Sequence, residues 1–167
     1  LLYGPPGTGK TTLATVIAQI TRRKFQMLSA VTSGVKEIRE VLEGSKRDWK
    51  MGRPSWILFI DEVHRLNKAQ QDVLLPYLEE GSIRFIGATT ENPSFEINNA
   101  IASRCIIYNF KALSDVEILD LLKRAAVVPI EPEVLERISK SSLGDARRAL
   151  NLLEHLMLSA KGEEKIT

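Results

Sequence analysis

Short apolar runs alternate with helical patterns along the first two thirds of the chain. The runs predict strands at residues 1–3, 25–29, 56–60, 83–88 and 106–110. Apolar residues at helical spacing predict helices over 11–23, 35–43, 67–78 and 98–103, and the polar, basic stretch 44–54 predicts a loop. The strands are apolar on both faces, as in Trp56–Ile60. This pattern favours the α/β class, with a parallel sheet flanked by helices on both sides.

The pattern after Phe110 is helical only. Helices are expected over 115–126, 132–141 and 145–160, and Ser114 with Glu117 forms a capping box for the first. We therefore expect two domains, an αβα base over residues 1–110 and a small all-helical domain over 111–167. The first apolar run, residues 1–3, is short for a strand. We therefore expect the first strand to be truncated and the chain to be part of a longer protein.

Composition narrows the class of protein. The chain is 44% hydrophobic and 26% charged with a net charge of +2, which is typical of a globular domain and argues against a tail-driven nucleic-acid binder. The single cysteine, Cys105, excludes a disulfide framework and a zinc site built on cysteine pairs. The sequence contains no apolar run of membrane-spanning length and no signal peptide, so we expect no membrane association and a cytoplasmic location.

A phosphate-binding motif follows the first apolar run. Its pattern is G-x-x-x-x-G-K-(S/T), in which glycines turn backbone N–H groups toward phosphates and the following helix adds its positive end. Lys10 would reach the β- and γ-phosphates of ATP, and the hydroxyl of Thr11 would bind Mg²⁺. The expected nucleotide-binding residues are Gly4, Pro5, Pro6, Gly7, Thr8, Gly9, Lys10, Thr11 and Thr12.

Two carboxylates end the apolar strand 56–60. Ligands of open α/β sheets bind at this end of the strands, so Asp61 is expected to hold Mg²⁺ and Glu62 to take the proton of an attacking water. Asp61-Glu62-Val63-His64 also spells the D-E-x-H pattern of one helicase superfamily, in which His64 would couple activities. The rest of the chain does not fit that superfamily, and we favour His64 as a helix-start residue that contacts its neighbours.

Longer strings point to one family. AVTSGVKEIRE (30–40), DEVHRLNKAQQD (61–72) and GATTENPSFEIN (87–98), with the phosphate-binding motif, Ser103-Arg104-Cys105 and Gly144-Asp145-Ala146-Arg147, resemble an AAA+ ATPase of the clamp-loader branch. They are most similar to the replication-associated recombination protein A family and its relative, the Werner-helicase-interacting ATPase. The resemblance implies that 1–110 is an AAA+ base and 111–167 its lid.

The resemblance also assigns roles to single residues. Thr90 matches sensor 1, which orients the attacking water, and Thr89 is the neighbouring candidate. Arg104 matches the arginine finger that completes a neighbouring subunit's site, and Arg147 matches sensor 2, which reaches ATP from the lid. Ser29 occupies the place of a polar switch for the catalytic glutamate.

The implied function is Mg²⁺-dependent ATP hydrolysis in replication-fork maintenance, recombination or DNA repair. The implied partners are ATP and ADP, DNA junctions or forks, single-stranded-DNA-binding protein, replisome components and further copies of the chain joined through regions outside it, in a bacterial nucleoid setting. Two alternatives remain. One is a clamp-loader subunit that opens a sliding clamp, and the other is a nucleotide-gated scaffold with little turnover.

A basic stretch surrounds Trp49. Such a surface could follow DNA phosphates while the aromatic ring stacks on an unpaired base, although a solvated loop is an equally good interpretation. Its basic residues are Lys36, Arg39, Lys46, Arg47, Lys50 and Arg53.

Overall fold

The structure is a computed structural model that describes residues 1–159, with only the backbone of residues 94 and 95. Its contacts divide the chain into two units. The base unit comprises Leu1–Gly4 and Lys10–Asn109, and the helical unit comprises Pro5–Gly9 with the chain from Phe110 onward. The predicted domains, 1–110 and 111–167, stay a prediction. The tip of the glycine-rich loop belongs by its contacts to the helical unit.

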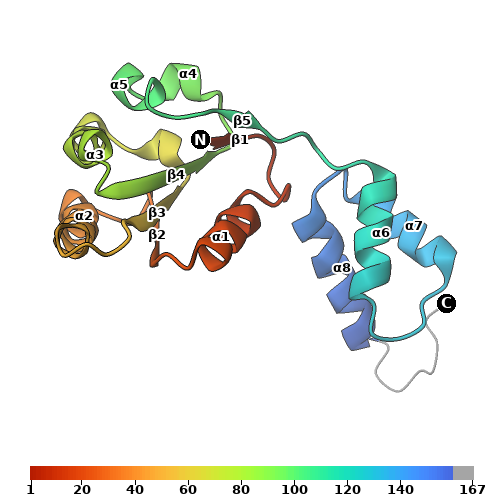
Figure 1. Ribbon diagram of the computed structural model, residues 1–167. Coiled ribbons are helices and arrows are strands. Elements are labelled where there is room, and N and C mark those ends of the chain that lie inside the picture. The colour runs from red at the N-terminus through yellow and green to blue at the C-terminus, as the bar shows by residue number, and fades with distance from the viewer. Residues whose placement is uncertain (160–167) are drawn as a thin grey trace. The chain divides into compact units, whose positions relative to one another are not determined.

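A parallel sheet forms the centre of the base unit (Figure 1). Its strands are β1 (Leu2–Tyr3), β2 (Phe25–Ser29), β3 (Trp56–Asp61), β4 (Ile83–Thr89) and β5 (Tyr108–Asn109). They lie side by side in the order β2-β3-β4-β1-β5, and every neighbouring pair runs parallel. One strand, β4, therefore separates the first run of the sequence from the run that carries the paired carboxylates.

Helices cover both faces of this sheet (Figure 1). Leu58 and Ile60 of β3 belong to the core that also holds Leu42, whereas Phe59 packs with Ala14. Because side chains alternate along a strand, the buried run of β3 fills the core on both faces. The predicted α/β class is confirmed. The helices are α1 (Lys10–Thr21), α2 (Val35–Lys50), α3 (Lys68–Glu80), α4 (Pro93–Glu96) and α5 (Asn99–Ala102), with the 3₁₀ turn η1 (Val63–Arg65).

The loop predicted over residues 44–54 is largely wrong, because α2 continues to Lys50. Tertiary contacts of its last turns hold it in helical form. The Ser45 hydroxyl is fully buried, donates to the Ser82 carbonyl at 2.5 Å and accepts from the Trp56 N–H at 2.9 Å. Asp48 accepts a hydrogen bond from Nε1 of Trp56 at 2.8 Å. The basic residues expected in a loop therefore stand mostly on a helix.

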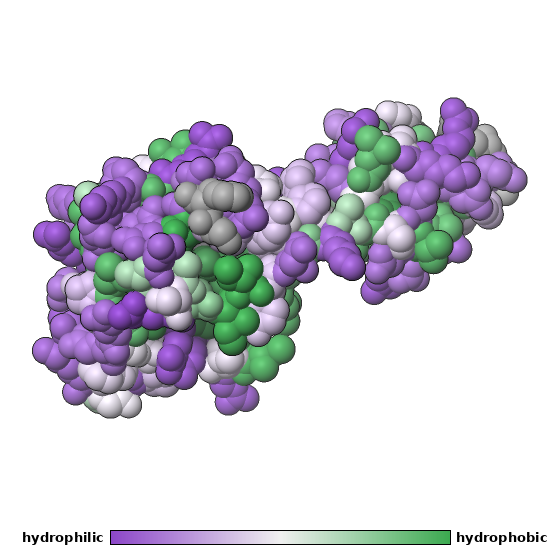
Figure 2. Space-filling view, turned by 90° about the horizontal axis from the view of Figure 1, so that it is seen from above, coloured by the Kyte–Doolittle hydropathy of each residue, from purple (hydrophilic) through white to green (hydrophobic). Residues whose placement is uncertain are grey.

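Apolar side chains reach the surface of the base unit. Seen from the side of α4, α5 and β5, hydrophobic surface lies among hydrophilic side chains (Figure 2). Ile106 is 69% and Ile107 44% exposed, and both precede β5 instead of forming part of it. The strand predicted over 106–110 is therefore only two residues long.

The helical unit has a core of its own. It is built from α6 (Asp115–Ala125), α7 (Pro132–Ser141) and α8 (Ala146–Ser159), and the Ser114–Glu117 capping box is present. The end of the predicted helix at Ala160, and the rest of the predicted lid to residue 167, lie outside the described residues. Over residues 1–159, no helix is both long and apolar enough to cross a membrane. The buried core residues are Ile118, Leu122, Leu135, Ala149 and Leu153.

Candidate functional site

The ends of the parallel strands bring expected site residues of the base unit, with the exception of Arg104, to one edge. Gly4 follows β1, Asp61 ends β3 and Thr89 ends β4. The Gly4 N–H donates to the Thr89 carbonyl at 3.1 Å, which fixes the start of the loop beside β4. Since β3 lies two strands from β1, Asp61 stands roughly 10 Å from the start of the loop. That spacing leaves room for a phosphate chain and its counterion.

Lys10 is the first residue of α1 and is buried, with 8% of its surface exposed. Its Nζ donates to the Gly4 carbonyl at 2.8 Å, so the ammonium group is held within the loop. A lysine is rarely buried without such partners, and a phosphate oxygen would be a stronger partner than a carbonyl. Thr11 follows in the first turn of α1 and is half-buried, and Thr12 is exposed.

The tip of the loop, Pro5–Gly9, has its contacts in the helical unit. The Gly7 carbonyl accepts from the N–H of Ala146, which begins α8, at 3.1 Å. Gly7 has φ +67°, and an added Cβ would lie 1.8 Å from Oδ1 of Asp145. Only glycine fits a position that is both left-handed and this crowded. Within the tip, the Thr8 hydroxyl donates to the Pro5 carbonyl at 2.9 Å, and Pro6 is exposed.

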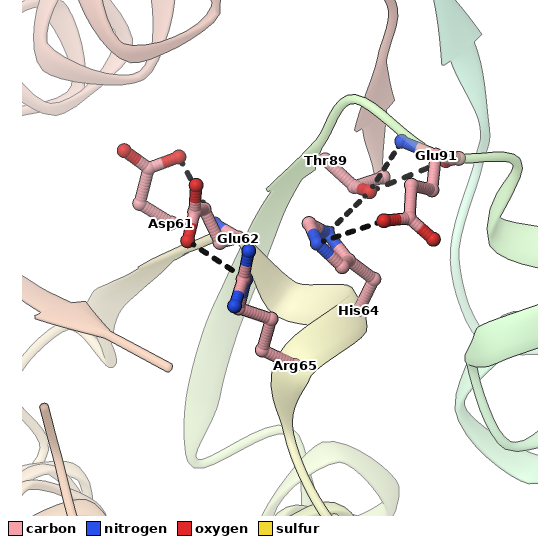
Figure 3. Close-up of polar contacts among 6 residues, drawn as sticks. All are labelled: Asp61, Glu62, His64, Arg65, Thr89 and Glu91. Carbon is pink, nitrogen blue, oxygen red and sulfur yellow. Dashed lines mark hydrogen bonds and ion pairs between the residues drawn. The ribbon is translucent and has the colours of Figure 1, made fainter. Parts of the chain in front are cut away.

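The two carboxylates at the end of β3 have different surroundings (Figure 3). Oδ1 of Asp61 accepts from the N–H of Glu62 at 3.0 Å. Glu62 has φ 51° and ψ 44°, and its Oε2 is 3.1 Å from Nε of Arg65. A left-handed backbone is uncommon for a residue with a side chain, and such conformations cluster at functional sites. The ion pair with Arg65 was not anticipated from the sequence. The only indication in the sequence is the spacing of Glu62 and Arg65, which are three residues apart in the string DEVHR.

The donor chemistry at this edge fits Mg²⁺. The Thr11 hydroxyl and the Asp61 carboxylate are hard oxygen donors, and both side chains are half-buried rather than sealed in the core. Among the described residues, no group of three or more His, Cys, Asp or Glu could hold a metal without other ligands. That donor set matches a cation held by one or two protein oxygens together with phosphate and water.

The predicted sensor residue lies just past its strand. Thr90 was expected to end the fourth strand, but β4 ends one residue earlier, at Thr89. Thr89 is 2% exposed and its Oγ1 is 2.9 Å from Nδ1 of His64, whereas Thr90 is exposed. His64 thus contacts its neighbours, as favoured above. Thr90, pointing away from the core, remains the candidate for contact with a water.

Arg104 lies in the turn after α5 and its side chain is 40% exposed. Its Nη2 is 2.6 Å from Oε1 of Glu79, and its Nη1 donates to the Ala100 carbonyl at 2.7 Å. The ion pair is solvent-exposed on both sides, so it holds the guanidinium only weakly. Burial raises the pKa of the neighbouring Cys105 thiol, which favours its neutral form.

The remaining candidates lie on helix surfaces or at a strand end. Arg147 is exposed in the first turn of α8. The Ser29 hydroxyl ends β2 and accepts from the Val31 N–H at 3.3 Å, while Glu62 is paired with Arg65. Of the basic residues around Trp49, two are in ion pairs: Lys46 with Glu80 and Arg53 with Asp48. The other four are exposed: Lys36, Arg39, Arg47 and Lys50.

Comparison with known families gives a match over most of the chain. The family described as "ATPase family associated with various cellular activities (AAA)" matches residues 1–112, which include every candidate above except Arg147. The fold is also that of a solved structure, the RuvB Holliday junction branch migration motor of Thermotoga maritima. The TM-score is 0.81 at 31% identity, over 99% of this chain and 57% of that chain.

Curated relatives are similar over nearly all of the sequence. Replication-associated recombination protein A of Escherichia coli K12 is 51% identical over 164 residues, which is 92% of this chain and 36% of the relative. Its namesake in Bacillus subtilis is 42% identical over the whole of this chain and 42% of the relative. ATPase WRNIP1 of Dictyostelium discoideum is 44% identical over 98% of this chain and 20% of the relative. The chain therefore spans less than half the length of these relatives, and the predicted resemblance is confirmed.

Proposed function

The chain belongs to the AAA family of ATPases and is related to replication-associated recombination protein A and to WRNIP1, and from this premise we propose that it binds ATP with Mg²⁺ and hydrolyses it. One observation carries the proposal. The parallel sheet brings the lysine of the glycine-rich loop and the paired carboxylates, Lys10 with Asp61 and Glu62, to the same edge. This is the edge at which open α/β sheets bind ligands.

Each residue has one task in the proposed reaction. Lys10 exchanges the Gly4 carbonyl for phosphate oxygens, and Thr11 and Asp61 hold Mg²⁺, which when bound neutralises charge on the β- and γ-phosphates. Glu62 leaves Arg65 and accepts a proton from the water that attacks the γ-phosphorus. The bond from that phosphorus to the bridging oxygen breaks, and ADP and phosphate are released.

Three further residues complete the proposed site. Thr90 orients the water, Arg147 reaches the nucleotide from the lid, and Arg104 stabilises transition-state charge in a neighbouring copy. The exposure of these three polar side chains supports the assignment, because each must be free to meet a ligand or another subunit.

The substitution Glu62→Gln tests the core of the proposal. It removes the proton acceptor but keeps the size of the side chain, so steady-state ATP turnover should fall by about a hundredfold or more while ATP binding is retained. Lys10→Ala is the matched variant, because it should lose nucleotide affinity as well. Undiminished turnover in the Glu62→Gln protein would show that another group is the base.

We propose further that ATP hydrolysis acts on DNA in replication, recombination or repair. The support is the similarity to proteins that are named for replication-associated recombination and for Holliday junction branch migration. Turnover should rise with DNA that contains a junction between single and double strands and respond little to blunt duplex. Hydrolysis indifferent to DNA would favour a protein-remodelling role, and no hydrolysis in either case would favour the nucleotide-gated scaffold.

The exposed basic face of α2 is the proposed DNA contact within this chain. Neutralising Lys36, Arg39, Arg47 and Lys50 should weaken DNA binding and flatten its salt dependence, because fewer counterions would be released. Neutralising Lys46 and Arg53, which already form ion pairs, is the control and should change the salt slope less. An unchanged salt slope in the first variant would exclude this face as the DNA contact.

A further inference from the structure

His64 is the buried polar side chain beside the candidate site that the proposed reaction does not use. Its side chain is 8% exposed, and both ring nitrogens have partners at the end of β4 or just after it (Figure 3). Nδ1 is 2.9 Å from Oγ1 of Thr89, and Nε2 is 3.3 Å from Oε1 of Glu91. One imidazole therefore contacts the residue before Thr90 and the residue after it.

The same segment is closed by a second hydrogen bond. Oγ1 of Thr89 accepts from the Glu91 N–H at 2.9 Å, so the turn that carries Thr90 is tied at its base. Thr90 itself is exposed at the top of that turn. His64 contacts Thr89 and Glu91 on either side of Thr90. His64 itself lies in η1, which starts directly after Glu62. The imidazole thus joins the segment of the proposed base to the segment of the proposed water-orienting hydroxyl.

The contact with the carboxylate defines the role of one ring nitrogen. Nε2 faces a carboxylate, which only accepts, so Nε2 carries a proton and donates. Nδ1 contacts the Thr89 hydroxyl, which also donates to the Glu91 carbonyl at 3.2 Å. A phenyl ring would fill the same space but make neither contact, and an asparagine would keep an acceptor near the position of Nδ1. The chain thus offers substitutions that separate packing from hydrogen bonding.

We propose that His64 is a positioning residue for ATP hydrolysis, which sets the Thr90 turn against Glu62 without touching the nucleotide. The inference rests on the proposed function. Since a small misplacement of a reacting group lowers the rate without weakening binding, loss of the imidazole contacts should lower kcat and leave KM nearly unchanged. A residue needed only for packing would change stability in proportion to activity.

The test measures kcat, KM, ATP affinity and Tm for the intact protein and for His64→Phe, His64→Asn and Thr89→Val. We expect His64→Phe to lower kcat by about tenfold to a hundredfold with KM and Tm close to wild type, and His64→Asn to recover part of that loss. Thr89→Val should lower kcat similarly, and the double variant His64→Phe, Thr89→Val should lose little more than either alone, because both remove the same contact.

Two results would overturn the inference. One is a His64→Phe protein with wild-type kcat, and the other is a double variant whose losses simply add. If His64→Phe does not fold, His64→Asn and His64→Gln replace it. Asparagine places a polar atom near the position of Nδ1, and glutamine places one near the position of Nε2. Equal activity of these two variants would contradict a role of the contact with Thr89. ATP turnover of the intact protein separates the two proposals: if the intact protein hydrolyses no ATP, the proposed function fails. If the intact protein hydrolyses ATP and His64→Phe is equally active, only the positioning role of His64 fails.

Discussion

Glu62 combines a left-handed backbone with the role of proposed base, and its conformation has a measurable cost. At φ 51° and ψ 44° a side chain crowds its own carbonyl, at a cost of roughly 1–2 kcal/mol that glycine does not incur. Its exposed ion pair with Arg65 offsets little of that cost. The conformation is therefore maintained by the fold around it.

We expect Glu62→Gly to be more stable than Glu62→Ala by about 1 kcal/mol, although both lack turnover. Both variants remove the carboxylate and the ion pair, so the comparison isolates the backbone. In a regular helix or strand the order would be reversed, because glycine gains more entropy in the unfolded chain. Urea unfolding of the two proteins measures the difference, and an alanine variant at least as stable as the glycine variant would show that position 62 is unstrained.

The position of a single residue in the fold could be predicted from the sequence where that position follows from chain continuity. Lys10 must follow the loop and Asp61 must end its strand, so both could be placed without the structure. Thr90 could not be separated from Thr89, because one residue decides which side chain enters the core. The pairing of Glu62 with Arg65 depends on a left-handed turn that no periodicity encodes.

At the scale of elements, Gly44 shows why α2 is longer than its sequence suggests. An added Cβ would lie 2.7 Å from Cη2 of Trp56, so glycine is needed for the close approach of helix and strand. The indole cannot easily retreat, because its Nε1 is bonded to Asp48 at 2.8 Å and Lys24 Nζ lies 3.4 Å from the ring centroid. The loop predicted from the polar, basic stretch 44–54 therefore missed the tertiary contact that stabilises the helix.

Gly44→Ala should destabilise the protein by about 1–3 kcal/mol, in spite of the gain of about 1 kcal/mol that alanine brings to a helix. The physical reason is overpacking against Trp56. Denaturant unfolding measures the loss, and the double variant Gly44→Ala, Trp56→Leu should show that the two effects are not additive. A Gly44→Ala protein more stable than wild type would mean that the indole yields and that propensity dominates.

The contact between α2 and α3 predicts a response to alkaline pH. Burial, and then the hydrogen bond that the Tyr77 hydroxyl donates to Glu43, raise the pKa of Tyr77 from 10.0 to about 12. The folded state thus holds this proton more tightly than the unfolded chain does. The contribution of the protonated Tyr77 hydroxyl to the free energy of unfolding is therefore complete below pH 10 and is lost as pH rises toward 12. Measured by unfolding, the stability advantage of wild type over Tyr77→Phe should shrink across that window. A constant difference would mean that the hydroxyl titrates alike in both states.

At the scale of the whole molecule, the fold class followed from periodicity but the grouping of the glycine-rich loop did not. Continuous apolar strands between helices permit a parallel sheet and little else, and that is what forms. By contrast, the tip Pro5–Gly9 has its contacts with the helical unit, through Gly7 and Ala146, a pairing of residues far apart in sequence. Such long-range contacts leave no local pattern.

Assembly gives the prediction of largest scale. If Arg104 acts in a neighbouring copy, Arg104→Ala keeps its own nucleotide site but supplies no finger, and Lys10→Ala supplies a finger but has no working site. Each should be nearly inactive alone, since an arginine finger is worth about a thousandfold or more. In an equal mixture about a quarter of neighbouring pairs in a head-to-tail ring would join a working site to an intact finger, and ATP turnover should return to about that fraction of wild type.

The exposed partner of Arg104 supplies the control for this experiment. Glu79→Gln removes the ion pair but keeps the guanidinium. This variant should remain active if Arg104 works across an interface. It should be as inactive as Arg104→Ala if the ion pair itself is required. The measurement is ATP turnover of the mixture after subunit exchange, with mixed oligomers verified by differently tagged variants. Mixed oligomers that stay inactive, together with an inactive Glu79→Gln protein, would place the role of Arg104 within its own chain, whereas recovered turnover with an active Glu79→Gln protein places it across the interface.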